Sequence, residues 1–139
     1  MNLDHHNNAF LTMIGLTLSR WEPGMAEFDL VVDHRHTNRQ GILQGGVLAT
    51  MLDAACGYAG LHDGTGVAEG VAEGVGEGQA VTLSLMVNYL ARVEGGRLRA
   101  VGTVTGGGRR IYFANGVVHA GDGSVVATAQ GSFKRMAPR

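Results

Sequence analysis

The sequence predicts a single α+β domain in which an antiparallel β-sheet wraps around one central helix. Three observations support this fold class. One long apolar stretch lacks the alternation of a strand, several other segments alternate between apolar and polar residues, and glycine-rich turns separate many of these segments. We treat residues 1–139 as one domain, with residues 1–9 flexible and residues 62–79 forming a glycine-rich loop.

The first third of the chain predicts a short helix and a β-hairpin. A helical turn is expected over Asn7 to Met13, capped by one of the two asparagines at its start. Residues 14–19 then alternate between apolar and small or polar side chains, as a half-buried strand does. The turn Glu22-Pro23-Gly24 leads into a second strand from Met25 to Asp33, so the two strands form a predicted hairpin.

The apolar stretch from Gly45 to Gly60 is the predicted central helix. It does not alternate, and it is long for a buried strand. Because it is apolar on nearly all sides, we expect other parts of the protein to cover most of its surface. Asp53 lies within it, and an ionised carboxylate in apolar surroundings is costly unless it is paired, hydrogen-bonded or protonated.

Four more strands are expected after the glycine-rich loop, at residues 80–90, 97–105, 110–119 and 124–134. Hairpin turns are predicted between them at residues 94–96, 106–108 and 121–123. A single sheet with one helix leaves sheet edges and an outer face that can associate with a second copy. We therefore expect at least a homodimer.

Composition and charge limit the classes of partner. The chain is 45% hydrophobic and 17% charged, with a formal net charge of −1. It therefore has no excess of positive charge that would attract nucleic acid or an anionic membrane. The start lacks the basic and apolar regions of a signal peptide, and the longest apolar run is too short to span a membrane. The single cysteine is typical of a reducing compartment. We expect a cytoplasmic protein that binds neither nucleic acid nor membrane.

Two features of the predicted helix suggest chemistry. Gly45 and Gly46 lie at its start, where backbone N–H groups lack acceptors within the helix and could bind a carbonyl oxygen as an oxyanion hole. Asp53 follows at about 12 Å from Gly45 along an ideal helix axis, which is too far for both to act on one group. Two antiparallel copies of the helix would bring one subunit's Gly45 to the other's Asp53, giving two composite sites per dimer.

The sequence resembles the hotdog-fold acyl-CoA thioesterases of the phenylacetate-pathway (PaaI-type) group from about Phe10 to Lys134. Members carry N-x-x-G-x-x-H-G-G and an acidic residue seven positions after the second glycine. The matching pattern here is Asn38-x-x-Gly41-x-x-Gln44-Gly45-Gly46-x6-Asp53. The run VTLSLMVNYLARV is similar to the family's later strand, in which Thr82 takes the place of a Ser or Thr that assists the acid. Gln44 replaces the family histidine; it can donate a hydrogen bond but does not titrate near neutral pH.

The resemblance implies catalytic roles for five of these residues. Gly45 N–H would polarise the thioester carbonyl, and the partner's acid, Asp53, would act as general base on water or attack directly as nucleophile. Thr82 would hold Asp53 by a hydrogen bond. Asn38 would position the water or the carbonyl, and Gln44 would orient the loop. No metal or redox cofactor is implied, because coenzyme A is part of the substrate.

Binding of the acyl-CoA substrate is assigned to a second group of residues. Gly46 allows close approach of the ligand to the backbone. The few cations near the predicted turns and the final strand could bind the phosphates of coenzyme A. The cations in this assignment are Arg109, Arg110 and Lys134. The chain is expected to act as a homodimer or as a dimer of dimers.

Other interpretations stay open. The chain could be a non-catalytic hotdog module that binds acyl-CoA, or a hotdog hydratase or dehydratase, although it lacks a D-x-N-P-[IL]-H segment. Asp53 could be structural and Thr82 a simple strand former. The pair His34 and His36 is expected to be solvated rather than to bind metal, because no third spaced ligand accompanies it. Cys56 is expected to be a core residue.

Overall fold

The structure is a computed structural model that describes residues 8–62 and 79–136. The predicted glycine-rich loop therefore lies almost wholly outside the described residues. The elements follow one another as a short helix, two strands, a 3-10 turn, the long helix and four strands. Their bounds are α1 Ala9–Ile14, β1 Thr17–Glu22, β2 Met25–Val32, η1 His34–His36, α2 Gly45–Ala59, β3 Gln79–Tyr89, β4 Gly96–Gly107, β5 Ile111–Ala120 and β6 Val125–Met136.

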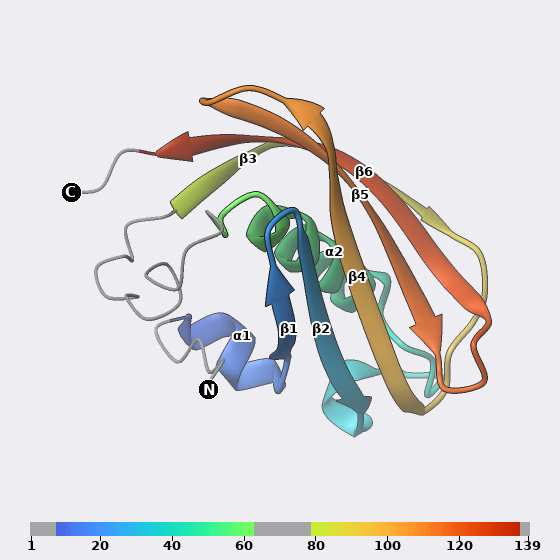
Figure 1. The fold of residues 1–139 in the computed structure, drawn as a ribbon. Helices are drawn as coiled ribbons and strands as arrows, with labels where there is room; N and C mark the ends of the chain where they lie inside the picture. The colour runs from blue at the N-terminus through green and yellow to red at the C-terminus, as the bar shows by residue number, and fades with distance from the viewer. Residues whose placement is uncertain (1–7, 63–78, 137–139) are drawn as a thin grey trace.

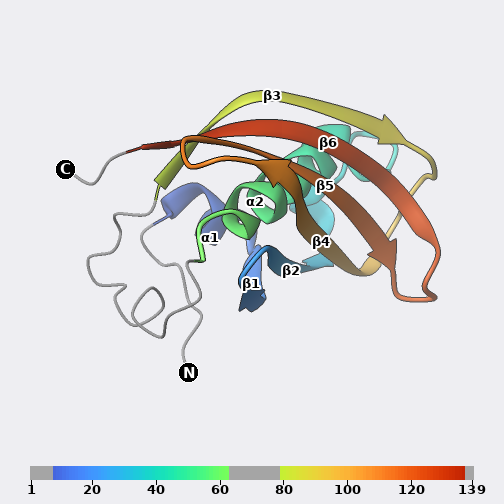
Figure 2. The ribbon, with the colours of Figure 1, turned by 45° about the horizontal axis from the view of Figure 1, so that its top comes forward.

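The six strands form one antiparallel sheet in the order β1-β2-β4-β5-β6-β3. Figures 1 and 2 show the sheet curving around α2, with β1 and β3 at its two edges. The predicted arrangement of a sheet wrapped around one helix is confirmed. The core lies between the sheet and the helix, where Met51, Leu52 and Ala55 of α2 are fully buried.

The predicted hairpin turn at residues 94–96 is wrong. Strands β3 and β4 do not pair, because β5 and β6 lie between them in the sheet. The connecting segment instead crosses the end of the sheet: Leu90 and Ala91 donate backbone hydrogen bonds to Val126 O, and Val93 O accepts one from Leu43 N. Gly95 lies at a bend in the chain just before β4, but a glycine carries no information about which strands the segment joins. The other three predicted hairpins are present.

Two glycines in the middle of the sheet allow α2 to approach it closely. Gly102 of β4 and Gly116 of β5 are directly opposite each other in the ladder. A Cβ atom on Gly102 would lie 2.3 Å from the carbonyl oxygen of Ala55, and one on Gly116 would lie 2.9 Å from Cys56 Sγ. Both distances are shorter than van der Waals contact. The absence of side chains at these two positions therefore fixes the depth at which the helix lies on the sheet.

Tyr112 of β5 anchors the end of α2. Its ring occupies the place that a side chain on Gly60 would need, since a Cβ there would lie 2.2 Å from the ring. Its hydroxyl donates a hydrogen bond to Gly57 O at 2.5 Å. The guanidinium of Arg135 lies 4.4 Å from the ring centroid and donates from Nε to Gly60 O at 2.9 Å. Burial raises the pKa of Tyr112 to about 12.

The raised pKa of Tyr112 predicts a loss of stability at high pH. The folded protein binds this proton more tightly than the unfolded chain, whose phenol titrates near the ordinary value of 10.0. The protonated Tyr112 phenol therefore stabilises the folded protein fully below pH 10.0, and this stabilisation declines as the pH rises towards about 12. We expect Tyr112→Phe to lose about 0.5–1.5 kcal/mol at neutral pH. Urea unfolding of the wild type and Tyr112→Phe from pH 7 to pH 11 tests this. The difference between their free energies of unfolding should become smaller above pH 10, and a difference that stays constant would contradict the prediction.

None of the helices within residues 8–62 and 79–136 has the length and hydropathy that a transmembrane helix requires.

Candidate active site

The start of α2 presents unpaired backbone N–H groups. Gln44 is the N-cap residue, and its side chain makes no capping hydrogen bond. Val47 N–H donates to Gln44 O at 3.0 Å, whereas no hydrogen bond within residues 8–62 and 79–136 uses the N–H groups of Gly45 or Gly46. Gly46 is exposed, and a Cβ atom on it would meet nothing within 4 Å. These two amides are open to a ligand at the positive end of the helix dipole.

Asp53 lies two turns further along α2 and is half-buried. Thr82 Oγ1 donates a hydrogen bond to Asp53 Oδ1 at 2.6 Å. Thr82 lies on β3, the edge strand beside β6, and both residues keep part of their surface exposed to solvent. The contact that the resemblance implied between these two side chains is therefore present in the structure. Their catalytic roles stay predictions.

One stripe along α2 is not fully covered within a single chain. Its residues are Gly46, Thr50, Asp53 and Gly57, which are spaced three or four apart and are half-buried or exposed. The opposite side of the helix, with Leu48 and Leu52, is buried against the sheet. The expectation that α2 is covered on most sides is thus met on the sheet side, while the stripe that carries Asp53 stays accessible.

Asn38 shapes the loop that leads into α2. Its side-chain oxygen accepts hydrogen bonds from Gln40 N at 2.8 Å and Ile42 N at 3.1 Å. Its own N–H donates to Ile42 O at 2.8 Å, and Gly41 completes the turn with a φ of 77°. These bonds engage the carboxamide oxygen in the loop itself. Any contact of Asn38 with a water or carbonyl would use its amide Nδ2 group.

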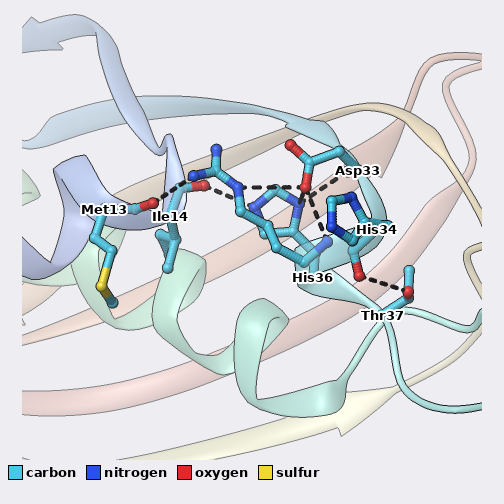
Figure 3. Close-up of polar contacts among 7 residues, drawn as sticks. Met13, Ile14, Asp33, His34, His36 and Thr37 are labelled. Carbon is cyan, nitrogen blue, oxygen red and sulfur yellow. Dashed lines mark hydrogen bonds and ion pairs between the residues drawn. The ribbon is translucent and has the colours of Figure 1, made fainter.

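The two histidines before this loop differ, and the expectation that both are solvated is wrong for His36. Figure 3 shows His36 bonded to two neighbouring segments: Nδ1 accepts from Asp33 N at 2.9 Å, and Nε2 lies 2.7 Å from Ile14 O. His36 is 1% exposed, so it is a structural link between η1 and the end of α1. Because both ring nitrogens are engaged, neither is available to a metal. Within the part of the chain that the structure describes, no three His, Cys, Asp or Glu residues gather as metal ligands.

The three predicted cations lie away from Asp53. Arg109 and Arg110 are exposed on the hairpin between β4 and β5. Lys134 is exposed on β6, where it lies opposite Val81 and Ile111. Its neighbours Phe133 and Arg135 point towards α2. Lys134 therefore projects from the outer face of the sheet. The geometry within one chain does not bring these cations together with Gly45.

Cys56 lies one turn after Asp53 but faces the sheet. It is fully buried, and burial together with the nearby Asp53 carboxylate raises the pKa of its thiol to about 12. The thiol is therefore protonated at neutral pH, and its nucleophilic thiolate form is negligible. The prediction that Cys56 is a core residue is confirmed.

Sequence reasoning missed Tyr89, the last residue of β3. Its hydroxyl donates a hydrogen bond to Gly45 O at 3.1 Å, and its ring lies beside the first turn of α2. The available signal was an aromatic residue seven positions after Thr82 on the same predicted strand. Simple alternation places the two on opposite faces of the sheet, but a register shift between Thr82 and Ser84 puts both on the side that faces the helix.

Comparisons with known proteins agree with this fold. The family model described as Thioesterase superfamily matches residues 40–127. Among solved structures, a conserved protein from Pseudomonas aeruginosa is 30% identical, with a TM-score of 0.77 over 93% of this chain and 94% of that one. A thioesterase family protein from Silicibacter pomeroyi is 27% identical, with a TM-score of 0.77 over 95% and 92% of the two chains.

A mutant of the phenylacetic acid degradation protein PaaI from Thermus thermophilus is 25% identical, with a TM-score of 0.75 over 93% of this chain and 100% of that one. No curated protein matches the sequence significantly. These likenesses confirm the hotdog fold and the resemblance to PaaI-type proteins.

Proposed function

Because the chain belongs to the thioesterase superfamily, we propose that it hydrolyses the thioester bond of an acyl-CoA or aryl-CoA to give a free acid and CoA. The observation that carries this proposal is the pairing of two features on α2. The N–H groups of Gly45 and Gly46 are open at the start of the helix. Asp53 lies on the accessible stripe of the same helix and accepts a hydrogen bond of 2.6 Å from Thr82. An oxyanion hole and an acid or base are the groups that thioester hydrolysis needs.

The active site in this proposal is shared between two subunits. Gly45 and Asp53 of one helix are about 12 Å apart along the axis, so they cannot flank one carbonyl. A second copy of α2, antiparallel to the first along the stripe that carries Asp53, would place its own Gly45 and Gly46 near this acid. The accessible stripe of α2 and the free edge of β3 support such pairing. We therefore propose a homodimer at least, with two sites.

The reaction then proceeds in one of two ways. With Asp53 as general base, the carboxylate takes a proton from water while the water oxygen bonds to the acyl carbon, and the negative charge that develops on the carbonyl oxygen is stabilised by the partner's Gly45 and Gly46 N–H groups. The C–S bond breaks, and the proton passes to the leaving thiolate. With Asp53 as nucleophile, its oxygen bonds to the acyl carbon, the thiolate leaves, and water hydrolyses the resulting anhydride.

Gln44 and Asn38 support the site from the preceding loop in this proposal. Gln44 N–H donates to His36 O at 2.9 Å, which ties the start of α2 to the buried histidine. The Gln44 side chain is exposed and makes no capping bond, so its amide can donate to a bound carbonyl. Asn38 contributes by holding the loop in shape. Arg109, Arg110 and Lys134 are proposed to bind the phosphates of CoA, for which their exposure suits them.

Thiol release measured across a panel of acyl-CoA and aryl-CoA esters, beside binding measured by calorimetry, tests the proposal. Release of CoA with at least one ester is the expected result. Binding of CoA esters without release by the purified oligomer would refute hydrolysis and favour the alternative of a non-catalytic acyl-CoA-binding module. Addition of water to an enoyl-CoA without thiol release would instead identify a hydratase.

A further inference from the structure

Tyr89 joins the edge strand of the sheet to the first residue of α2. It is opposite the buried Ala127 in the ladder between β3 and β6, so its side chain lies on the side of the sheet that faces the helix. Its hydroxyl donates to Gly45 O at 3.1 Å. Its ring atoms lie 3.2–3.4 Å from the place of a Cβ atom on Gly45, so the ring packs against the bare α-carbon of this glycine.

The hydrogen bond acts on the peptide that joins Gly45 to Gly46. A carbonyl and the following N–H belong to one rigid plane. A bond to Gly45 O therefore fixes the direction of Gly46 N–H, and it also polarises this N–H group as a donor. The ring contact restricts the same glycine, which has no side chain of its own to limit its conformations. Tyr89 thus restrains one of the two N–H groups that are open to a ligand.

The same strand restrains the acid. Thr82 and Tyr89 both face α2, and between them a register shift at residues 82–84 interrupts the ladder. Thr82 holds Asp53, and Tyr89 holds Gly45. One edge strand therefore contacts Asp53, which serves one site of the proposed dimer, and Gly45, which begins the helix of the other site. The Tyr89 side chain is also 54% exposed, so its hydroxyl and ring are not simply filling the core.

We propose that Tyr89 is a positioning residue for the thioester carbonyl: through Gly45 O it orients the Gly46 N–H group of the oxyanion hole. This inference rests on the proposed hydrolysis. Tyr89 does not touch the reacting atoms. Its contribution arises in the transition state, where charge on the oxygen makes the direction of each donor more important than in the bound substrate.

Tyr89→Phe is the test, since it removes only the hydroxyl. We expect kcat for thiol release to fall about 3- to 10-fold, the range for one neutral hydrogen bond, with KM changed less than about 2-fold. The amide NMR signal of Gly46 should shift and its order parameter should fall, because its peptide plane loses one restraint. The matched control is Ser84→Ala, which removes a hydroxyl from the same strand where it contacts Ser132 on the outer face. It should leave kcat and the amide NMR signal of Gly46 unchanged.

The outcomes separate this inference from the proposed function. If the wild-type protein releases thiol and Tyr89→Phe does so at the same kcat with an unchanged Gly46 amide signal, the role of Tyr89 is overturned while hydrolysis stands. An equal loss of kcat in Ser84→Ala would also overturn it, because the effect would then reflect the strand as a whole. If the wild-type protein releases no thiol from any ester, the proposed function fails, and the positioning role of Tyr89 fails with it.

Discussion

Asp53→Asn is expected to lower kcat/KM for thiol release by about 10²- to 10⁴-fold, the contribution typical of a positioned acid or base. Asparagine has the shape of aspartate and keeps an oxygen that can accept the hydrogen bond from Thr82 Oγ1, which is 2.6 Å long in the structure. The variant should therefore fold and assemble normally. It lacks the negative charge needed to take a proton from water or to attack the acyl carbon. Initial rates of CoA release with the best ester of the panel measure the effect.

The matched control is Asp29→Asn on β2. Asp29 is a partly exposed carboxylate that lies 3.3 Å from Arg99 Nε, and its strand β2 is separated by three strands from β3, which contacts Asp53. The same substitution there should leave kcat/KM within about 2-fold of the wild type. Near wild-type turnover by folded, oligomeric Asp53→Asn would remove Asp53 from the mechanism and leave it a structural carboxylate.

Gly102→Ala is expected to have the largest effect on stability. The added Cβ atom would lie 2.3 Å from Ala55 O and 2.6 Å from Cys56 N, and both of these are backbone atoms of α2 that cannot rotate away. The helix must therefore move off the sheet and disturb the core that it covers. We expect the free energy of unfolding to fall by about 3 kcal/mol or more, at the upper end of the range for overpacked cores. Urea unfolding followed by circular dichroism measures this change.

Gly106→Ala provides a control within the same strand. A Cβ atom on Gly106 meets nothing within 4 Å, so the substitution should alter the free energy of unfolding by less than about 0.5 kcal/mol. Equal stability of Gly102→Ala and Gly106→Ala would mean that α2 does not lie against the bare backbone of β4.

Local sequence patterns predicted most of the fold because burial imposes periodicity. The helix expected from Gly45 to Gly60 extends from Gly45 to Ala59, and the last four strands match their predicted ranges to within about two residues. The strand expected at residues 14–19 begins only at Thr17, because Gly15 ends α1 in the left-handed region with a φ of 79°. Pairing between strands distant in sequence leaves no local signal, which explains the error at residues 94–96.

The candidate site was predictable in part. The spacing from Gly45 to Asp53 and the resemblance identified the helix that is proposed to carry the chemistry, and Thr82 emerged from the resemblance alone. Tyr89 was missed because a register shift after Thr82 reverses the alternation along β3, and such a shift depends on how β6 pairs with it. The burial of His36 was missed because its bond to Ile14 O depends on the tertiary fold, whereas its bond to Asp33 N is a local cap of η1.

The central claim, that each site combines the acid of one subunit with the helix start of the other, is tested most directly by mixing two inactive variants. Asp53→Asn lacks the acid. Gly46→Val places a side chain where the structure of one chain has open space, so it should fold yet block the approach of the carbonyl. Each variant alone has two defective sites per dimer. A mixed dimer has one intact site, formed by Gly46 of the first variant and Asp53 of the second.

Co-expression of the two variants in equal amounts, with mixed assemblies verified by native mass spectrometry, gives the measurement. Random pairing makes half of the dimers mixed, so we predict recovery of about a quarter of the wild-type activity. If mixed assemblies form and thiol release stays at the level of the separate variants, Asp53 and Gly46 act within one chain or not at all, and the shared site is contradicted.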